Sequence, residues 1–195
     1  MKFYHSVTII DNYDSYTHNL KQLLDEAGAQ NITIMLCDQI DWDILNKSDL
    51  IVLSPGPGIP EESGQLMEVI ERFETSKPIL GICLGMQAIV CHFDGDLVNL
   101  KTVHHGESSQ LKLQNSGPGL FGRIPQPIYV GRYHSWAVDS LSFPDQLEVM
   151  ATTSDECIMA MRHKKLPIWG FQFHPESILT PYGLQMVQLM YQTQH

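Results

Sequence analysis

Residues 78–87 read Pro78-Ile79-Leu80-Gly81-Ile82-Cys83-Leu84-Gly85-Met86-Gln87. An apolar run typical of a buried strand ends here at a cysteine flanked by glycines, and a helix is expected to begin at the next residue. A sharp turn from strand to helix exposes its central side chain, which is how the Gly-x-Ser-x-Gly hydrolases present their nucleophile. The stretch therefore predicts an α/β fold with Cys83 as a nucleophile.

A second stretch, Phe171-Gln172-Phe173-His174-Pro175-Glu176, supplies a candidate base. A thiol attacks as the thiolate, a form that both a helix N-terminus and a nearby imidazole favour. In an extended strand, residues two apart point to the same side, so Glu176 is expected to orient His174. Cys83, His174 and Glu176 would then form a nucleophile, base and orienting carboxylate. The pattern predicts a cysteine-dependent acyl-transfer enzyme.

Each of these residues also has an ordinary structural interpretation. Free cysteine is often buried, and this interpretation is kept for Cys91 and Cys157, which lack glycine neighbours. The two glycines beside Cys83 favour the elbow instead. Taken alone, His174-Pro175 is typical of a surface turn, and with nine histidines in the chain the sequence does not fix which one lies near the cysteine. Gln87 follows Cys83 at i+4, on the same helix face, where its amide can contact a polar substrate.

Residues 7–93 alternate between strand-like and helix-like runs. Apolar runs predict strands at 7–10, 31–37, 49–54 and 78–82, and apolar side chains at helical spacing predict helices at 16–27, 62–75 and 84–93. Ser15 is expected to cap the first helix, with Gly28 just beyond its end. Strands that alternate with helices form a parallel sheet covered on both faces.

After Gly95 the pattern changes to strand-like segments separated by turns. The segments lie at 97–100, 110–113, 128–133, 147–152, 158–162 and 168–173, with a turn at 115–119 and a last helix at 181–191. No repeat, low-complexity stretch or linker divides the chain. We expect residues 1–195 to form a single α/β domain with three layers, in which helices flank a mixed, mostly parallel sheet beside a smaller antiparallel hairpin region.

The loop Ser54-Pro55-Gly56-Pro57-Gly58 follows the strand expected at 49–54. Ligands bind at this end of the strands in open α/β sheets. The prolines stiffen the loop, and the glycines let backbone N–H groups approach a ligand closely. An ordinary turn explains the same residues. As a functional loop it would supply an oxyanion-hole N–H from Gly56, with the N–H of Leu84 as the second donor.

The bulk composition excludes several classes of function. The chain is 43% hydrophobic and 17% charged, and its formal net charge of −10 disfavours nonspecific nucleic-acid binding. No apolar run approaches the roughly 20 residues of a membrane span, and the first residues lack the apolar core of a signal peptide. The four cysteines form no Cys-x-x-Cys pair, and no cluster has metal-ligand spacing. We expect a cytoplasmic protein with reduced thiols, no metal and no cofactor.

Together these stretches resemble the class I glutamine amidotransferases, which have a flavodoxin-like fold. The resemblance covers essentially the whole chain, and Cys83, Gln87 and His174-Pro175-Glu176 carry it for the class. Two further stretches resemble its chorismate-linked branch, the glutaminase subunits of anthranilate synthase and aminodeoxychorismate synthase. They are Asp11-Asn12-Tyr13-Asp14-Ser15 and Gly131-Arg132-Tyr133-His134-Ser135.

The resemblance implies a role for each matching residue. Cys83 would attack the side-chain amide of L-glutamine, with His174 moving the proton and Glu176 fixing the imidazole. The N–H groups of Gly56 and Leu84 would hold the oxyanion. The α-amino and carboxylate groups of glutamine would be held by a set of four residues: Gly56, Gln87, Ser135 and Trp136.

The resemblance also implies a partner. Because the 195 residues leave no room for a synthase domain, we expect the released ammonia to pass to a chorismate-using synthase subunit in a hetero-oligomer. The route should be closed, since water would protonate ammonia to unreactive ammonium. The product would be anthranilate, for tryptophan biosynthesis. The alternative is that the chain serves aminodeoxychorismate synthase, for folate and p-aminobenzoate biosynthesis, either alone or in addition.

Four positions depart from the pattern of this branch. Met86 stands where histidine is usual, Asp96 replaces a glycine, Glu107 replaces a lysine and Trp136 replaces a commoner leucine. Met86 follows a non-catalytic position, so activity should survive. Positions 96 and 107 lie toward the partner subunit in the family, so they bear on the partner contact and not on the chemistry.

Two other functions compete with this hypothesis. A cysteine peptidase or gamma-glutamyl hydrolase on the same fold would share the cysteine and the histidine, but Gln87 and residues 132–135 favour free glutamine. A catalytically silent regulatory subunit is the competitor from a different class. Such relatives usually lose the cysteine or the histidine, and this chain keeps both.

Overall fold

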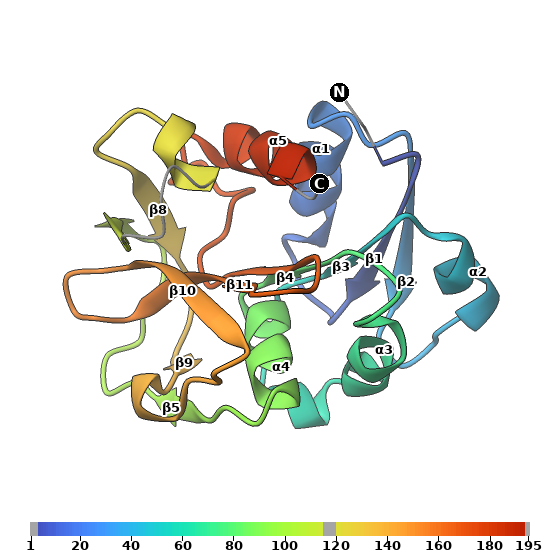
Figure 1. Cartoon of the computed structure of the whole chain (residues 1–195), viewed down its shortest axis with the longest axis horizontal. Coiled ribbons are helices and arrows are strands. Elements are labelled where there is room, and N and C mark those ends of the chain that lie inside the picture. Colours follow the sequence, from blue (N-terminus) through green and yellow to red (C-terminus); the bar gives the residue numbers. More distant parts are fainter. Residues whose placement is uncertain (1–3, 115–119, 194–195) are drawn as a thin grey trace.

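The computed structural model describes residues 4–114 and 120–193, so the turn expected at 115–119 lies outside the described residues. Its centre is an eight-stranded mixed sheet with the order β2-β1-β3-β4-β12-β11-β10-β7 (Figure 1). The first five strands in this order are parallel, and the last three are antiparallel. The strands are β1 (Ser6–Asp11), β2 (Asn31–Leu36), β3 (Leu50–Leu53), β4 (Ile79–Ile82), β7 (Lys112–Leu113), β10 (Leu147–Thr152), β11 (Ile158–His163) and β12 (Ile168–Phe171).

Two small antiparallel sheets lie beside this main sheet. In one, β5 (Leu97–Asn99) pairs with β9 (Trp136–Val138), and in the other β6 (Glu107–Gln110) pairs with β8 (Tyr129–Arg132). The mixed sheet with a smaller antiparallel region, as predicted from the sequence, is therefore confirmed. The parallel part has the 2-1-3-4-5 order of flavodoxin-like folds, in which ligands bind at the carboxyl ends of the strands.

Helices cover both faces of the main sheet (Figure 1). Two of them, α1 (Thr17–Glu26) and α5 (Gly183–Thr193), share one apolar core. Three others, α2 (Trp42–Lys47), α3 (Leu66–Phe73) and α4 (Leu84–His92), share the core on the opposite face. The three layers predicted from the alternation of strands and helices are thus present. Short 3-10 turns lie at Pro60–Glu62, Leu120–Arg123 and Ser140–Ser142.

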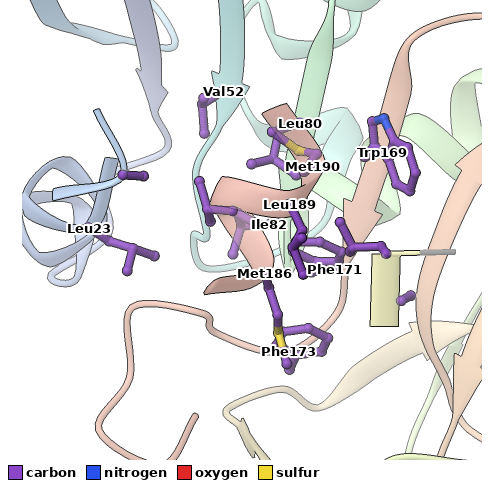
Figure 2. Close-up of a cluster of buried hydrophobic side chains, with 14 of the residues drawn as sticks. Leu23, Val52, Leu80, Ile82, Trp169, Phe171, Phe173, Met186, Leu189 and Met190 are labelled. Carbon is purple, nitrogen blue, oxygen red and sulfur yellow. The ribbon is translucent and has the colours of Figure 1, made fainter. Parts of the chain in front are cut away.

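The central strands send alternate side chains into the two cores. In β3, Leu50 and Val52 join the core beneath α1 and α5, whereas Ile51 and Leu53 join the core beneath the other three helices. Figure 2 shows the first core, in which the rings of Phe171 and Phe173 stack with centroids 5.0 Å apart near Met186 of α5. Burying one such side chain stabilises the fold by about 1.5–3 kcal/mol.

Four local expectations are wrong. The single strand expected at 110–113 is divided, since β6 ends at Gln110 and β7 begins at Lys112, and the two strands belong to different sheets. Ser15 does not cap α1, since the helix begins at Thr17, and the carboxylate of Asp14 instead accepts the N–H of Tyr16 at 2.7 Å. The helix expected at 62–75 begins only at Leu66, because the chain turns at Gly64 with φ +55°. The strand expected at 168–173 ends at Phe171. This residue pairs with Ile82, the last residue of β4, and the parallel pairing of the two strands stops there.

Candidate active site

Cys83 joins β4 to α4 in a backbone conformation that only glycine adopts freely. Its φ is +52° and its ψ is −105°, and such a conformation costs on the order of 1–3 kcal/mol in a residue with a side chain. A Cβ atom on Gly81 would come within 2.5 Å of the backbone of Gly85, and one on Gly85 would overlap the carbonyl of Leu53. Both glycines are therefore required where the strand turns into the helix.

His174 and Glu176 form a buried pair just past the end of β12. The Nδ1 of His174 lies 2.6 Å from Oε1 of Glu176, and their side chains are 3% and 0% exposed. The two residues lie at the start of a turn rather than in the extended strand that we expected. The turn is held in place because the N–H of His174 donates to the carbonyl of Gly131 at 3.1 Å and the hydroxyl of Thr180 donates to the carbonyl of His174 at 2.7 Å.

The second ring nitrogen of His174 is buried beside Cys83. This Nε2 makes no hydrogen bond within the described part of the chain. Burial by itself would lower the pKa of His174, but the nearby thiol of Cys83 and the carboxylate of Glu176 outweigh it and raise the pKa to about 10. The imidazole is therefore protonated at neutral pH and faces the sulfur as a cation, which favours a thiolate.

Two tyrosines to which sequence reasoning gave no individual role, Tyr133 within a quoted motif and Tyr16 at the start of an expected helix, pack against the imidazole of His174. The ring centroids of Tyr133 and Tyr16 lie 4.9 Å and 5.8 Å from that of His174, both edge-on. The hydroxyl of Tyr133 is 3.0 Å from the hydroxyl of Ser177, which fixes the ring. These contacts restrict the rotation of the imidazole. Neither tyrosine has a spacing in the sequence that would have revealed this role.

The loop at 54–58 is attached to the end of β1 and packs against the elbow. Asn12 donates its backbone N–H to the hydroxyl of Ser54 and its side-chain N–H to the carbonyl of Ser54, both at 2.9 Å. A Cβ atom on Gly56 would lie 2.5 Å from Cβ of Asn12 and 2.8 Å from the side chain of Leu84. The backbone of Gly56 therefore lies beside the first residue of α4, where helix N–H groups have no partner within the helix.

Two of the residues predicted to hold glutamine, Gln87 and Trp136, are hydrogen-bonded to each other. The side-chain nitrogen of Gln87 donates to the carbonyl of Trp136 at 2.8 Å and to the side-chain oxygen of Gln172 at 3.1 Å. The carbonyl of Ser135 accepts the N–H of Leu100 at 2.7 Å, which fixes the segment beside β9. Gln172, which we did not single out from the sequence, donates to the sulfur of Cys83 at 3.5 Å.

The described residues show neither a metal centre nor a membrane-spanning helix. Across 4–114 and 120–193, no three or more histidines, cysteines, aspartates and glutamates are grouped so that they could hold a metal ion. Over the same ranges, no helix has the length and apolar character needed to cross a membrane. The side chains and backbone of the site offer a thiol, a cationic imidazole and N–H groups at the start of a helix.

Comparison with known proteins identifies the relatives of this chain. A family model described as Glutamine amidotransferase class-I matches residues 8–192. Two curated proteins are similar to most of the chain, the Multifunctional tryptophan biosynthesis protein of Pichia angusta (44% identity over 94% of this chain) and the Aminodeoxychorismate/anthranilate synthase component 2 of Bacillus subtilis (39% over 96%). The chain spans 50% of the first protein's length and 96% of the second's.

A solved structure is similar over nearly the whole fold. A crystal structure from Thermoplasma acidophilum, described as that of a GMP synthase subunit, superposes with a TM-score of 0.84 and 28% sequence identity. The superposition covers 98% of this chain and 94% of the other. With a family model that matches almost its full length, this chain belongs to the class-I glutamine amidotransferase family.

Proposed function

We propose that this chain is the glutaminase subunit that releases ammonia from L-glutamine for a chorismate-using synthase subunit, which then makes anthranilate. One observation carries the proposal: at a strained elbow Cys83 faces the buried, unpaired Nε2 of His174, whose other nitrogen is held by Glu176. A silent regulatory subunit would have no use for this arrangement. The name of the similar protein from Pichia angusta, a tryptophan biosynthesis protein, supports the choice of an anthranilate-forming synthase.

The proposed reaction proceeds through a thioester. The thiolate of Cys83 attacks the side-chain carbonyl carbon of glutamine, and the oxyanion is held by N–H groups of Gly56 and Leu84. His174 gives its proton to the departing nitrogen, so that ammonia leaves and a thioester remains. The now neutral imidazole takes a proton from water, which attacks the thioester and releases glutamate. The carboxylate of Glu176 stabilises the imidazolium whenever it forms.

Substrate recognition in this proposal uses the connected amides beside the thiol. Gln87, Ser135 and Trp136, together with Gly56, hold the α-amino and carboxylate groups of glutamine. The hydrogen bond between Gln87 and Trp136 and the bond from Leu100 to Ser135 keep these three residues in place before substrate arrives. Such preorganisation lowers the cost of binding. A cysteine peptidase would need room for a longer chain at these positions, so a glutamyl peptide should be hydrolysed far more slowly than free glutamine.

A second partner is supported by a specific observation. The similar protein from Bacillus subtilis is named for both aminodeoxychorismate synthase and anthranilate synthase. The same glutaminase chain can therefore be proposed to serve an aminodeoxychorismate synthase, alone or in addition. In either complex, ammonia would travel by a closed route, because bulk water at neutral pH would convert it to ammonium.

The test is product identity. The purified chain would be mixed in turn with an anthranilate-type and an aminodeoxychorismate-type synthase subunit, together with chorismate and glutamine, with ammonium as the control for synthase activity. We expect weak glutaminase activity from the chain alone, and stronger activity with anthranilate formation in the presence of the first partner. Product with both partners would identify a shared glutaminase. No glutamine-dependent product with either partner, while ammonium supports both synthases, would contradict the proposal.

A further inference from the structure

Gln172 lies between the thiol of Cys83 and the amide of Gln87, and both the nitrogen and the oxygen of its side-chain amide form hydrogen bonds. It is fully buried. Its nitrogen donates to the sulfur of Cys83 at 3.5 Å, and its oxygen accepts from the nitrogen of Gln87 at 3.1 Å. A buried amide that contacts the reacting sulfur has a direct influence on the charge that this sulfur can carry.

The orientation of the Gln172 amide follows from its neighbours. The carbonyl of Trp136 can only accept, so the group of Gln87 that meets it at 2.8 Å must be the NH₂ group. The second hydrogen of this NH₂ group then points at Gln172, so the side-chain oxygen of Gln172 must be the acceptor. The NH₂ group of Gln172 is therefore turned toward the sulfur as a donor.

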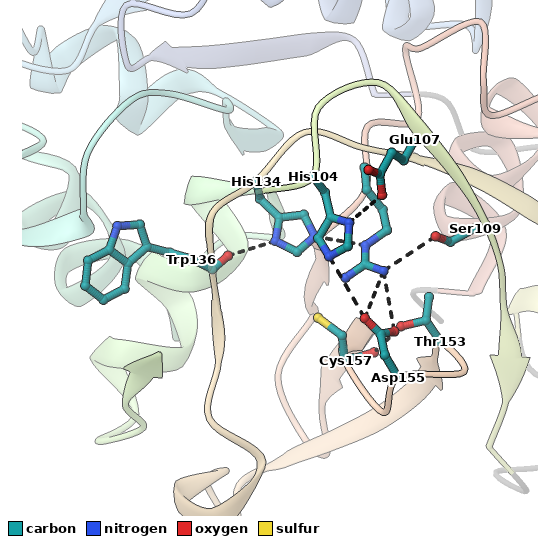
Figure 3. A network of polar contacts seen from close by, with 9 residues as sticks. His104, Glu107, Ser109, His134, Trp136, Thr153, Asp155 and Cys157 are labelled. Carbon is teal, nitrogen blue, oxygen red and sulfur yellow. Dashed lines mark hydrogen bonds and ion pairs between the residues drawn. The ribbon is translucent and has the colours of Figure 1, made fainter. Parts of the chain in front are cut away.

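His134 fixes the same carbonyl from the other side. Its Nδ1 lies 2.9 Å from the carbonyl of Trp136 and must carry the hydrogen, while its Nε2 accepts from the Nε of Arg132 at 3.3 Å (Figure 3). Burial, which outweighs the hydrogen bond to Trp136, lowers the pKa of His134 to about 4, and the charges of Arg132, His104 and His174 act in the same direction. The imidazole is thus neutral and held as one tautomer.

The hydrogen bonds continue outward from His134 to Arg132, which forms an ion pair at the surface. Arg132 is 3% exposed and its NH1 lies 3.1 Å from Oδ2 of the half-exposed Asp155, while His104 meets Glu107 at 2.6 Å alongside it (Figure 3). Two hydrogen bonds that lead inward from Arg132 are fixed in direction: the guanidinium donates to His134, and His134 donates to the Trp136 carbonyl. The same carbonyl also accepts from the amide of Gln87. We call this series, Arg132, His134, the Trp136 carbonyl, Gln87 and Gln172, the amide relay.

We propose that Gln172 is a further catalytic residue of this site, an N–H donor that stabilises the thiolate of Cys83, and that the amide relay holds it in the donor orientation. The inference rests on the proposed function and adds a residue to it. The sulfur is negative before it attacks glutamine and again when water displaces it from the thioester. Gln172 assists both steps, because it donates to the sulfur itself rather than to the oxyanion.

The test uses the thiol directly. The full chain and its variants would be treated with iodoacetamide across a pH series, and carboxamidomethylation of Cys83 would be followed by peptide mass spectrometry. Burial raises the pKa of Cys91 to about 12 and of Cys157 to about 11, so these thiols react slowly at neutral pH. His174, which acts on Cys83, and its neighbours Glu176 and Asp14 are retained in every variant.

Two substitutions at Gln172 remove the donor. Gln172→Leu is expected to slow alkylation of Cys83 at pH 7 by about three- to tenfold and to move its pH profile upward, because a hydrogen bond to a charged group is lost. Gln172→Glu places a carboxylate beside the sulfur, which disfavours the thiolate, and should slow the alkylation of Cys83 further. In glutamine hydrolysis the loss should fall on kcat more than on KM, since Gln172 donates to the sulfur, while Gln87 keeps its shorter hydrogen bond to the Trp136 carbonyl.

Substitutions at His134 test the amide relay at a residue that forms no hydrogen bond with the thiol. His134→Leu removes the donor to the Trp136 carbonyl and should slow alkylation in the same direction, by a smaller factor. His134→Asn returns a donor near the position of Nδ1 and should restore the rate. Arg162→Gln is the matched control, because Arg162 forms an ion pair with Glu148 at 2.7 Å outside the relay, and its alkylation profile should equal that of the unsubstituted chain.

The outcomes separate the two proposals. Unchanged alkylation in both Gln172 variants, with glutamine still hydrolysed, would overturn the role of Gln172 and leave the proposed function standing. Slower alkylation in Gln172→Leu and His134→Leu, with recovery in His134→Asn, would support the relay even if neither synthase gave a glutamine-dependent product. If Gln172→Leu fails to fold, the two His134 variants and Gln172→Glu still decide the question.

Discussion

Two buried histidines near the site differ in charge because their ring nitrogens face different groups. Burial alone lowers the pKa of both. Burial of His134 outweighs its hydrogen bond to the Trp136 carbonyl, and the charge of Arg132 lowers the pKa further, so this imidazole stays neutral. His174 faces a carboxylate and a thiol, and its pKa rises to about 10. The same side chain thus serves as a fixed neutral connector at one position and as a cationic acid at the other.

The neutral state of His134 predicts a pH dependence of stability. Its pKa is about 4 in the folded chain and 6.5 in the unfolded one. As pH falls from 6.5 to 4 only the unfolded chain takes up the proton, so stability is lost across this window, by up to ~3 kcal/mol. In His134→Asn this contribution is absent. Urea unfolding from pH 7 to 4 should therefore give a shallower loss for the variant, and equal slopes would contradict a neutral, buried His134.

At the scale of elements, the elbow joins β4 to α4 at the expense of backbone strain. Cys83 has a conformation that glycine adopts readily and other residues do not. The sheet and the helix maintain it, since β4 is buried between β3 and β12 and the residues of α4 from Leu84 to Val90 are all buried. The strain costs stability and places the thiol at the helix N-terminus, as the proposed role of Cys83 as nucleophile requires.

The strain predicts an order of stability among inactive variants. Cys83→Ala keeps a side chain in the left-handed conformation, whereas Cys83→Gly removes the steric cause of the strain. Gly also gains entropy in the unfolded chain, which offsets part of the benefit. We expect Cys83→Gly to be more stable than Cys83→Ala by about 1 kcal/mol. Chemical denaturation of the pair would measure this difference, and an Ala variant as stable as the Gly variant would argue against strain at the elbow.

The elements that the sequence predicted are those with a strong pattern, and the missed ones lack it. Buried strands such as β3 and β4 are apolar runs in the sequence, and α1 shows helical spacing. By contrast, α2 is six residues long and buries only Leu45, so no periodicity could develop. Its start did carry a signal, because the side chain of Asp41 accepts the N–H groups of Asp43 and Ile44.

The site was predictable only in part for a related reason. Cys83 stands between glycines and Glu176 follows His174 at close spacing, so their residue types and positions suggested the chemistry. Gln172 and Gln87 are 85 positions apart, and their hydrogen bond depends on the parallel pairing of β12 with β4. Such contacts arise from the tertiary fold, and local sequence does not encode them. The pairing of His174 with Glu176 was expected from an extended strand, yet it is formed at a turn.

At the scale of the whole molecule, the parallel sheet brings the ends of β1, β3, β4 and β12 to one edge, and the candidate active site lies there. Within residues 4–114 and 120–193, the sulfur of Cys83 accepts one hydrogen bond, from Gln172 at 3.5 Å, so we expect its removal to leave the fold intact and the chemistry to be separable from assembly. Cys83→Ala is expected to bind the synthase subunit normally while glutamine-dependent product falls to background. The synthase in that complex should still use ammonium.

Gel filtration of the mixed subunits and parallel assays with glutamine and ammonium would measure this separation. The unsubstituted chain provides the reference for both nitrogen sources. Retained glutamine hydrolysis in Cys83→Ala would refute the nucleophile, because alanine has no group that can form the thioester. Loss of the complex would instead place the elbow within the docking surface. Since Cys83 is buried at 6% exposure, we expect the partner to contact the rim of the site and not the thiol.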